Sequence, residues 1–441
     1  MKRPALLDPC RQLSLYSLMT NILQPAGTLP AATPAAAAAS PRVPLAPVLS
    51  LRSFAPLGGA RLPSVLDAGA SRLVTSGRIA IGMALREMGL GPGDAVLVPA
   101  YHTLSMVAPL LWAGVEPVFY EVRPDATVDP QELERRRTPA VRAVLATHYF
   151  GFHQDMAALR AWCDGAGVRL VEDCAHCWFG ELQGRPVGAW GDYAIASSMK
   201  FYPAYEGGCL VSARHALTAP AAQSAGLGFE AKSALAALER AFAHGRLGLL
   251  EALLALPLRL KDALWQRAKR SKAKAGVGAG TGKPAAAALA PDSSDSSVRF
   301  DPAWLDRRSA LFSRAVLRLA NSARIVGARR ANYRRLEAAL AGLPGLRPLH
   351  PALPDGVCPW VLPMLCEAPE PLFAALQARG VPLLRFASVH DPATHAFPTS
   401  AALVRQVLGF PVHQELREEE LRWLCESIRT AAQEVGEAVR A

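Results

Sequence analysis

The spacing of hydrophobic residues changes repeatedly over residues 75–215, and this change predicts a sheet covered by helices. Helical spacing occurs at 79–90, 104–113 and 156–166, and short apolar runs typical of buried strands occur at 95–98, 117–122, 141–147 and 168–171. Short buried strands that alternate with helices form mostly parallel sheets with helices on both faces. We therefore predict an α/β fold for this part of the chain.

A second, smaller unit with both helices and strands is predicted after residue 298. The expected helices are 304–342, 371–379 and 418–435, and the strand-like runs are 361–365 and 381–385. This mixture predicts a small C-terminal α+β domain, which we place at residues 299–441.

The composition divides the rest of the chain. Residues 1–58 are rich in Ala and Pro, which predicts a disordered leader, so order is expected to begin near residue 60. Residues 59–215 form the predicted large domain. Residues 216–298 are an insertion that begins with an expected helix at 230–270 and continues into a disordered Gly-, Ala- and Ser-rich linker.

The positive charge of the chain is concentrated in this insertion. Lys and Arg number 48 and Asp and Glu number 37, which leaves a net charge of +11. Much of the excess lies at 259–274, a stretch that would suit an anionic lipid or nucleic acid. A solvated helix face is the simpler interpretation, because no zinc-finger, RNA-binding or helix-turn-helix motif accompanies it. We therefore expect no nucleic-acid partner, and at most a peripheral membrane contact.

The cysteines and the N-terminus favour the cytoplasm. The eight cysteines are scattered, as in proteins of a reducing compartment. Cys174 and Cys177 form a C-x-x-C motif, but no second pair follows at zinc spacing, so we expect no metal site. Asp8 and Arg11 interrupt the apolar start that a signal peptide requires, and no apolar run is long enough to span a membrane.

Lys200 is the residue that most strongly indicates chemistry. It follows Asp173 by 27 positions (200 − 173), and Asp173 lies at the carboxyl end of an expected strand, where α/β proteins bind ligands. Serines precede the lysine, and Gly207-Gly208 follow it. Such groups could hold an aldehyde cofactor. The amine would form a covalent bond to the aldehyde, the carboxylate would bind a ring nitrogen, and the hydroxyl groups would bind a phosphate.

The segment 75–212 resembles the DegT/DnrJ/EryC1/StrS family of pyridoxal-phosphate-dependent aminotransferases, the nucleotide-sugar aminotransferases of fold type I. The matching pieces follow the order that the family has. They are Thr75–Gly77, Gly91–Ala100, Gly114–Phe119, His148–Met156, Val171–His176, Gly188–Asp192, Lys200 and Glu206–Gly208, and Phe410–Leu416 resembles the family's closing motif. No single piece is specific, whereas the ordered set is.

The resemblance implies roles for three of these residues. Lys200 would be the catalytic residue, bonded to the aldehyde of pyridoxal 5′-phosphate (PLP) and then shuttling a proton once substrate releases it. Asp173 would pair with the ring nitrogen of the cofactor and keep it protonated. His176 stands where the family often has glutamine, near the ring hydroxyl, although a packed core histidine is an alternative.

The resemblance also implies a phosphate site. Ser76, Gly77 and Arg78 open a predicted helix, whose first N–H groups and positive dipole end suit an anion. The family usually has threonine or another small residue in place of Arg78. Ser197 or Ser198 could add a hydroxyl to the same phosphate.

Two departures from the family concern the residue that stacks on the cofactor ring and the part of the site that would bind substrate. An aromatic residue that stacks on the cofactor is common where Thr103 stands, so Tyr101 or His102 would have to replace it. Phe201 and Tyr202 stand where asparagine is usual, which suggests an altered substrate end.

We therefore expect a cytoplasmic PLP enzyme that transfers an amino group from an amino acid to a keto group of a nucleotide-linked sugar, for cell-surface polysaccharide or secondary-metabolite biosynthesis. The resemblance alone implies a homodimer. One alternative is an enzyme of the same fold with a non-sugar substrate. The other is a non-catalytic regulator or scaffold that uses the basic helix at 247–272 to bind a membrane or a partner.

Overall fold

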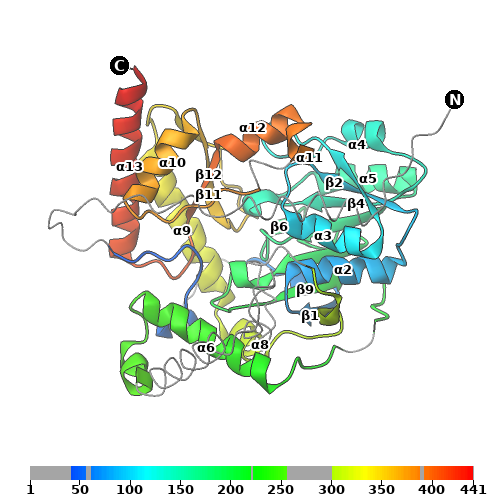
Figure 1. The fold of residues 1–441 in the computed structure, drawn as a ribbon, viewed down its shortest axis with the longest axis horizontal. Coiled ribbons are helices and arrows are strands. Elements are labelled where there is room, and N and C mark those ends of the chain that lie inside the picture. The colour runs from blue at the N-terminus through cyan, green and yellow to red at the C-terminus, as the bar shows by residue number, and fades with distance from the viewer. Residues whose placement is uncertain (1–40, 56–60, 220–221, 256–299, 388–391, 441) are drawn as a thin grey trace, which may run out of the picture. The chain divides into compact units, whose positions relative to one another are not determined.

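A seven-stranded sheet organises the large domain of the computed structural model (Figure 1). The structure describes residues 41–55, 61–219, 222–255, 300–387 and 392–440. The strand order is β1 (Ala70–Val74), β9 (Gly208–Ser212), β8 (Tyr193–Ser197), β5 (Arg169–Cys174), β4 (Val141–Thr147), β2 (Ala95–Pro99) and β3 (Glu116–Tyr120). The strands from β8 to β3 pair in parallel, which agrees with the predicted mostly parallel sheet, although no strand was predicted at β8. β1 and β9 form an antiparallel edge that was not predicted either.

The helices of this domain begin and end where local signals place them. They are α2 (Gly77–Met88), α3 (Leu104–Ala113), α4 (Pro130–Arg136) and α5 (Met156–Ala166). The Ser76 side chain caps α2 by accepting from the Ile79 N–H at 3.3 Å. Gly114 and Gly167 take the left-handed conformation at the ends of α3 and α5, as their positions in the sequence predict.

A three-stranded antiparallel sheet organises the small domain. Its strands are β10 (Leu346–Pro348), β11 (Val361–Cys366) and β12 (Val407–Pro411), and its longer helices are α9 (Ser322–Leu340), α10 (Pro369–Ala378), α12 (Pro398–Gln406) and α13 (Glu418–Arg440). The predicted continuous helix 304–342 is wrong. The chain breaks between α8 (Leu311–Leu319) and α9, where Asn321 leaves the helical conformation and caps α9 through the Arg324 N–H. With its two kinds of domain, the chain has the predicted fold class.

Residues 41–55 are ordered, contrary to the expectation for the leader 1–58. Leu49 is buried, and the Ser50 hydroxyl donates to the Glu415 carboxylate at 2.6 Å. The bond to Glu415 therefore ties this segment to the small domain, and its apolar residues contribute to the core, which composition alone did not reveal. The earlier part of the leader lies outside the described residues.

The start of the insertion is a helical segment anchored to the small domain. It contains α6 (Leu227–Ala243), and the buried Arg246 that follows donates to the Glu420 carboxylate at 2.8 Å. The rest of the expected helix 230–270, its basic stretch and the linker lie largely beyond residue 255, outside the described residues. Among the helices that the structure describes, none is both long and apolar enough to cross a membrane.

Candidate functional site

A pocket lies where the carboxyl ends of β5 and β8 meet the first turn of α2. Its lining residues are Gly77, Arg78, Ile81, Thr103, Ser105, Met106, Thr147, Asp173, Ala175, His176, Ile195, Ser197, Lys200 and Phe386. Six of the predicted site residues are among them, namely Gly77, Arg78, Asp173, His176, Ser197 and Lys200. Four others, Ser76, Tyr101, His102 and Ser198, do not line it.

The parallel register places Asp173 at the floor of the pocket. Within the sheet it lies beside Thr147 of β4 and Ile195 of β8. Its carboxylate accepts from the Thr147 hydroxyl at 3.1 Å and from the Ala175 N–H at 2.9 Å. Burial raises the pKa of Asp173, and the Ala175 N–H and the positive charge of Lys200 oppose this rise. A cationic group in the pocket would therefore stabilise the ionised carboxylate.

Lys200 ends a short 3-10 turn, Ser198–Lys200, that directly follows β8. Its side chain is partly buried, and the Nζ atom lies 5.0 Å from the centroid of the Trp360 ring. This distance is typical of a cation–π contact. The amine is thus held beside an aromatic surface within the same pocket as the Asp173 carboxylate.

The first turn of α2 and the end of β8 form a cradle with unused donors. The Ser197 and Thr75 hydroxyls are buried and have no hydrogen-bond partner in the described part of the chain. Of these two residues, Ser197 lines the pocket together with Gly77. Buried hydroxyls without partners are costly unless a ligand engages them, so these groups suit an anion at the helix N-terminus. Ser76 instead uses its hydroxyl as the helix cap.

The second glycine of the Gly207-Gly208 pair is required by a close backbone approach. A Cβ atom at Gly208 would lie 2.5 Å from the Ser76 carbonyl carbon and 2.7 Å from the Gly77 nitrogen. No side chain fits there, so glycine lets β9 pass directly against the first turn of α2. Gly208 therefore allows the backbone of β9 to support the first turn of α2 on the side away from the pocket.

His176 is a neutral, oriented donor. Burial lowers its pKa well below the usual value, and the positive charge of Lys200 lowers it further. Its Nδ1 accepts from the Phe150 N–H at 3.4 Å, which leaves the proton on Nε2. The ring packs at 4.0 Å on Trp360 and edge-on at 4.9 Å to Phe386.

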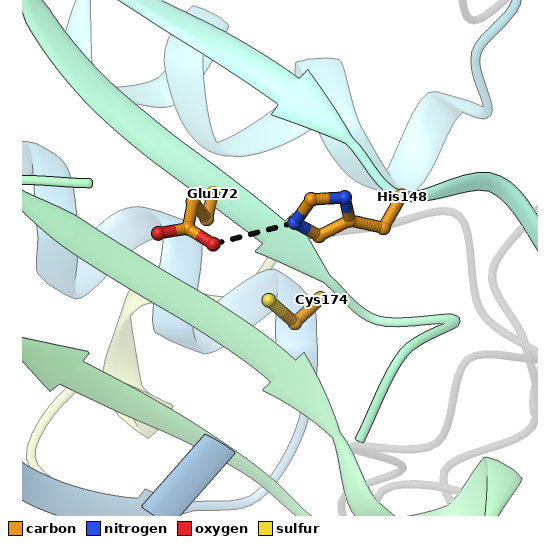
Figure 2. Close-up of side chains that lie close together, drawn as sticks. All are labelled: His148, Glu172 and Cys174. Atoms are coloured by element: carbon orange, nitrogen blue, oxygen red, sulfur yellow. Dashed lines mark hydrogen bonds and ion pairs between the residues drawn. The ribbon is translucent and has the colours of Figure 1, made fainter. Parts of the chain in front are cut away.

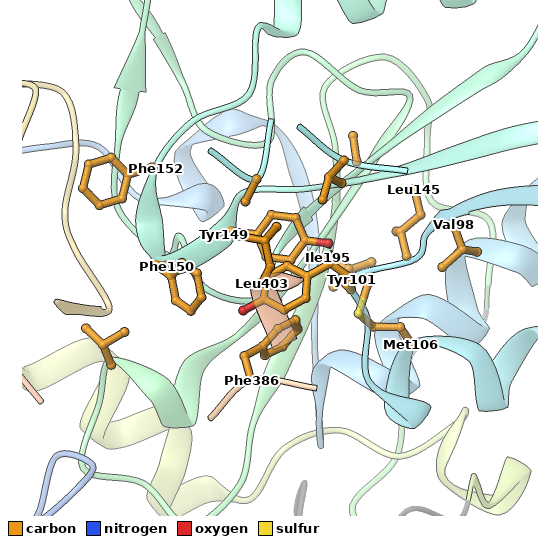
Figure 3. Close-up of a cluster of buried hydrophobic side chains, with 14 of the residues drawn as sticks. Val98, Tyr101, Met106, Leu145, Tyr149, Phe150, Phe152, Ile195, Phe386 and Leu403 are labelled. Atoms are coloured by element: carbon orange, nitrogen blue, oxygen red, sulfur yellow. Dashed lines mark hydrogen bonds between the residues drawn. The ribbon is translucent and has the colours of Figure 1, made fainter. Parts of the chain in front are cut away.

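Tyr101 and His102 do not occupy the position that the sequence suggested for them. The Tyr101 ring is buried and stacks at 5.0 Å on Tyr149, with the Phe386 ring edge-on at 5.0 Å (Figure 3). His102 is buried and shares a hydrogen bond of 2.9 Å with the Ala100 carbonyl. The expectation that one of them lines the cofactor site is therefore not supported. Thr103, which neighbours them, does line the pocket.

The aromatic residues after Lys200 also point away from the pocket. Phe201 and Tyr202 are buried in a hydrophobic cluster, with exposed fractions of 0% and 5%. Their difference from the family pattern therefore changes the core beneath the lysine turn rather than the pocket wall.

Sequence reasoning missed the walls that other segments supply. Thr147 could have been found, because it ends a predicted strand next to the strand of Asp173. Thr103 and Ser105, whose hydroxyls lie 2.8 Å apart, could have been found at the start of a predicted helix. Phe386 comes from the small domain, and no motif in the sequence marks it.

A buried group of possible metal ligands lies outside the pocket lining. His148, Glu172 and Cys174 approach one another, and the His148 Nε2 lies 3.3 Å from a Glu172 oxygen (Figure 2). Both Glu172 oxygens also accept backbone N–H bonds, from Gly188 and from Trp190 and its neighbour. The carboxylate thus anchors the turn before β8, and the buried cysteine packs beside it.

The chain is similar to known proteins in both sequence and fold. Residues 65–275 match the model of the DegT/DnrJ/EryC1/StrS aminotransferase family. The chain is 39% identical over 137 residues to dTDP-3-amino-3,4,6-trideoxy-alpha-D-glucose transaminase from Streptomyces venezuelae. This aligned region is 31% of this chain and 35% of that protein. It is 32% identical over 142 residues to GDP-perosamine synthase from Vibrio cholerae, covering 32% of this chain and 39% of that protein. The aligned region is thus little more than a third of each relative.

Solved structures match over a larger share of the chain. The Streptomyces venezuelae protein DesV aligns with a TM-score of 0.54 at 24% identity, covering 85% of this chain and 91% of that one. The PMP form of the putative sugar aminotransferase Spr1654 from Streptococcus pneumoniae aligns with a TM-score of 0.57 at 16% identity, covering 87% and 94%. At these identities the likeness establishes the fold, which is fold type I, as the sequence predicted. Over residues 65–275, a little under half of its length, the chain is similar to the DegT/DnrJ/EryC1/StrS aminotransferase family.

Proposed function

We propose that this protein is a PLP-dependent aminotransferase that moves an amino group from an amino acid to the keto group of a nucleotide-linked sugar. One observation carries the proposal: a single pocket is lined by an amine, a buried carboxylate and a buried hydroxyl that has no hydrogen-bond partner among the described residues. They belong to Lys200, Asp173 and Ser197. The family supports the reaction class, and the relatives named above are a sugar transaminase and a perosamine synthase.

The residues of the pocket fit PLP group by group. When bound, PLP supplies an aldehyde that carries the amino group and a ring that withdraws electrons. Ser197, Gly77 and the first N–H groups of α2 would hold its phosphate, and Arg78 would add a positive charge. Asp173 would hold the ring nitrogen, and the Nε2–H of His176 would donate to the ring hydroxyl.

Lys200 would act at two points. Its amine would bond to the cofactor aldehyde in the resting enzyme, and the free amine would then move a proton to and from the substrate carbon. The aromatic surface of Trp360 would keep Nζ on the inner side of the pocket. The small-domain residue Phe386 would help to exclude water from that side.

An amino-transfer assay tests the proposal. The purified protein should transfer nitrogen from an amino acid to a keto-sugar nucleotide when PLP is present. Lys200→Ala should lower kcat by at least about 10⁴-fold, because it removes the covalent anchor and the proton shuttle together. Turnover that ignores PLP or survives this substitution would refute the proposal. Activity only with carbonyl acceptors that are not sugars would redirect it to another substrate class.

A further inference from the structure

Arg329 of α9 is a buried cation that reaches the lysine turn. It is completely buried, and this burial lowers its pKa to about 10, so it remains charged at neutral pH. Its guanidinium donates to the Gln414 side-chain oxygen at 3.0 Å and to the carbonyl oxygens of Pro359 at 3.2 Å, Trp360 at 3.1 Å and Lys200 at 2.8 Å. All four acceptors are uncharged.

Gln414 and Phe201 complete this arrangement. The Arg329 guanidinium lies 4.4 Å from the centroid of the Phe201 ring, and the Gln414 amide donates to the Phe201 carbonyl at 2.8 Å. Arg329 and Gln414, which we call the Arg329–Gln414 clamp, thus bind two successive carbonyls of the chain at Lys200 and Phe201. A buried charge is expensive unless its donors are satisfied, so the folded chain favours keeping these bonds formed.

We propose that the Arg329–Gln414 clamp positions Lys200 for its work in the pocket. The same guanidinium fixes the main chain of Lys200 and the main chain of Trp360, whose ring lies beside Nζ. Both the root of the lysine side chain and the surface beside its tip are therefore set by one cation of the small domain. Arg329 does not line the pocket, so it is a positioning residue rather than a catalytic one. This inference rests on the proposed function of Lys200.

The clamp also explains the aromatic residue that follows the lysine. Phe201 offers the guanidinium a ring face, which suits a planar cation whose acceptors in the described part of the chain are all uncharged. The departure of Phe201 from the family pattern thus belongs with the positioning of Lys200, and not with substrate recognition.

Arg330 provides a matched control on the same helix. It is 7% exposed, and it donates to the Pro354 and Val357 carbonyls at 2.6 Å and to the Asp355 carboxylate at 3.1 Å. These contacts fix a segment of the small domain and do not include the lysine turn. Replacing Arg330 therefore removes a comparable buried guanidinium without releasing Lys200.

The test compares Arg329→Met with Arg330→Met. Both should lower the thermal unfolding temperature, which is measured first without PLP. The rate at which added PLP attaches covalently to Lys200 is then measured by borohydride trapping. In the folded protein, Arg329→Met should lower this rate by about 10- to 100-fold, because a displacement near 1 Å of a reacting group costs this much. Its kcat should fall equally, with the KM for the amino donor within about threefold. Arg330→Met should keep capture and kcat within about twofold.

A second variant keeps the test open if Arg329→Met does not fold. Gln414→Leu retains the guanidinium and releases the Phe201 carbonyl, so it should slow PLP capture in the same direction by about 3- to 10-fold. Capture and kcat at wild-type values in a folded Arg329→Met or Gln414→Leu protein would overturn the clamp. So would an equal loss in Arg330→Met, because that result indicates a general structural role. If the wild-type protein captures no PLP at Lys200, the proposed function fails and the clamp fails with it.

Discussion

The two sides of the pocket are built by different physical means. Asp173, Thr147 and Ser197 come from neighbouring strands, whose pairing register alone brings them together. On the other side, the small domain supplies Phe386, which lines the pocket, and Trp360, whose ring lies beside the Lys200 Nζ. Packing between distant segments sets the positions of both. The strand-end side holds the groups that would bind the cofactor, whereas the small-domain side holds groups that orient the lysine and close the pocket. Substitutions can therefore disturb the cofactor-binding groups and the orientation of Lys200 separately.

Asp173→Asn should produce the larger effect, because it removes chemistry from the strand-end side. The amide keeps the shape and the backbone bond, but it cannot hold a proton on the ring nitrogen. We expect kcat to fall by about 10²- to 10⁴-fold, while PLP still attaches covalently to Lys200. Steady-state kinetics and borohydride trapping measure the two properties. A variant with wild-type kcat would show that the carboxylate has no role in the reaction.

The same substitution should stabilise the protein without cofactor, in a pH-dependent manner. The folded state raises the pKa of Asp173 above its ordinary value of 3.8. The unfolded chain therefore loses this proton at a lower pH than the folded protein does, so wild-type stability declines as the pH rises above about 4. The gain in unfolding temperature of Asp173→Asn should be larger at pH 7 than at pH 4. A gain that is equal at both values would contradict the assigned burial effect.

Trp360→Leu should produce the smaller effect, because it disturbs orientation and leaves the chemistry in place. It removes the ring beside the Lys200 Nζ but keeps the main-chain carbonyl that Arg329 binds. A cation–π contact contributes about 0.5–2 kcal/mol, so kcat should fall by about 3- to 30-fold.

Trp360→Phe is the control for this prediction, since it retains an aromatic face. Its kcat should stay closer to the wild-type value than that of the leucine variant, and equal losses in both would show that the ring acts only by filling space. Such a result would weaken the distinction between the two sides of the pocket.

The sequence predicted the strand-end side better than the small-domain side for a physical reason. Period and turn signals located the strands that end near Thr147 and Asp173, and parallel sheets bind ligands at one edge, although the strand that carries Ser197 was not predicted. Arg329 lies within the expected helix 304–342, and nothing in its local sequence pattern shows that it is buried. Tyr101 and His102 were misplaced because a strand end can turn its side chains into the core as readily as into a pocket. Their burial depends on partners such as Phe386, far away in the sequence.

The most direct test of the account is to map where the cofactor attaches. The wild-type protein is incubated with PLP, reduced with borohydride and digested, and the peptides are analysed by mass spectrometry. The account predicts one modified peptide, with the added mass on Lys200, and its loss in Lys200→Ala. Attachment at another lysine, or none at all under conditions in which the protein is folded, would contradict the claim that this pocket holds PLP.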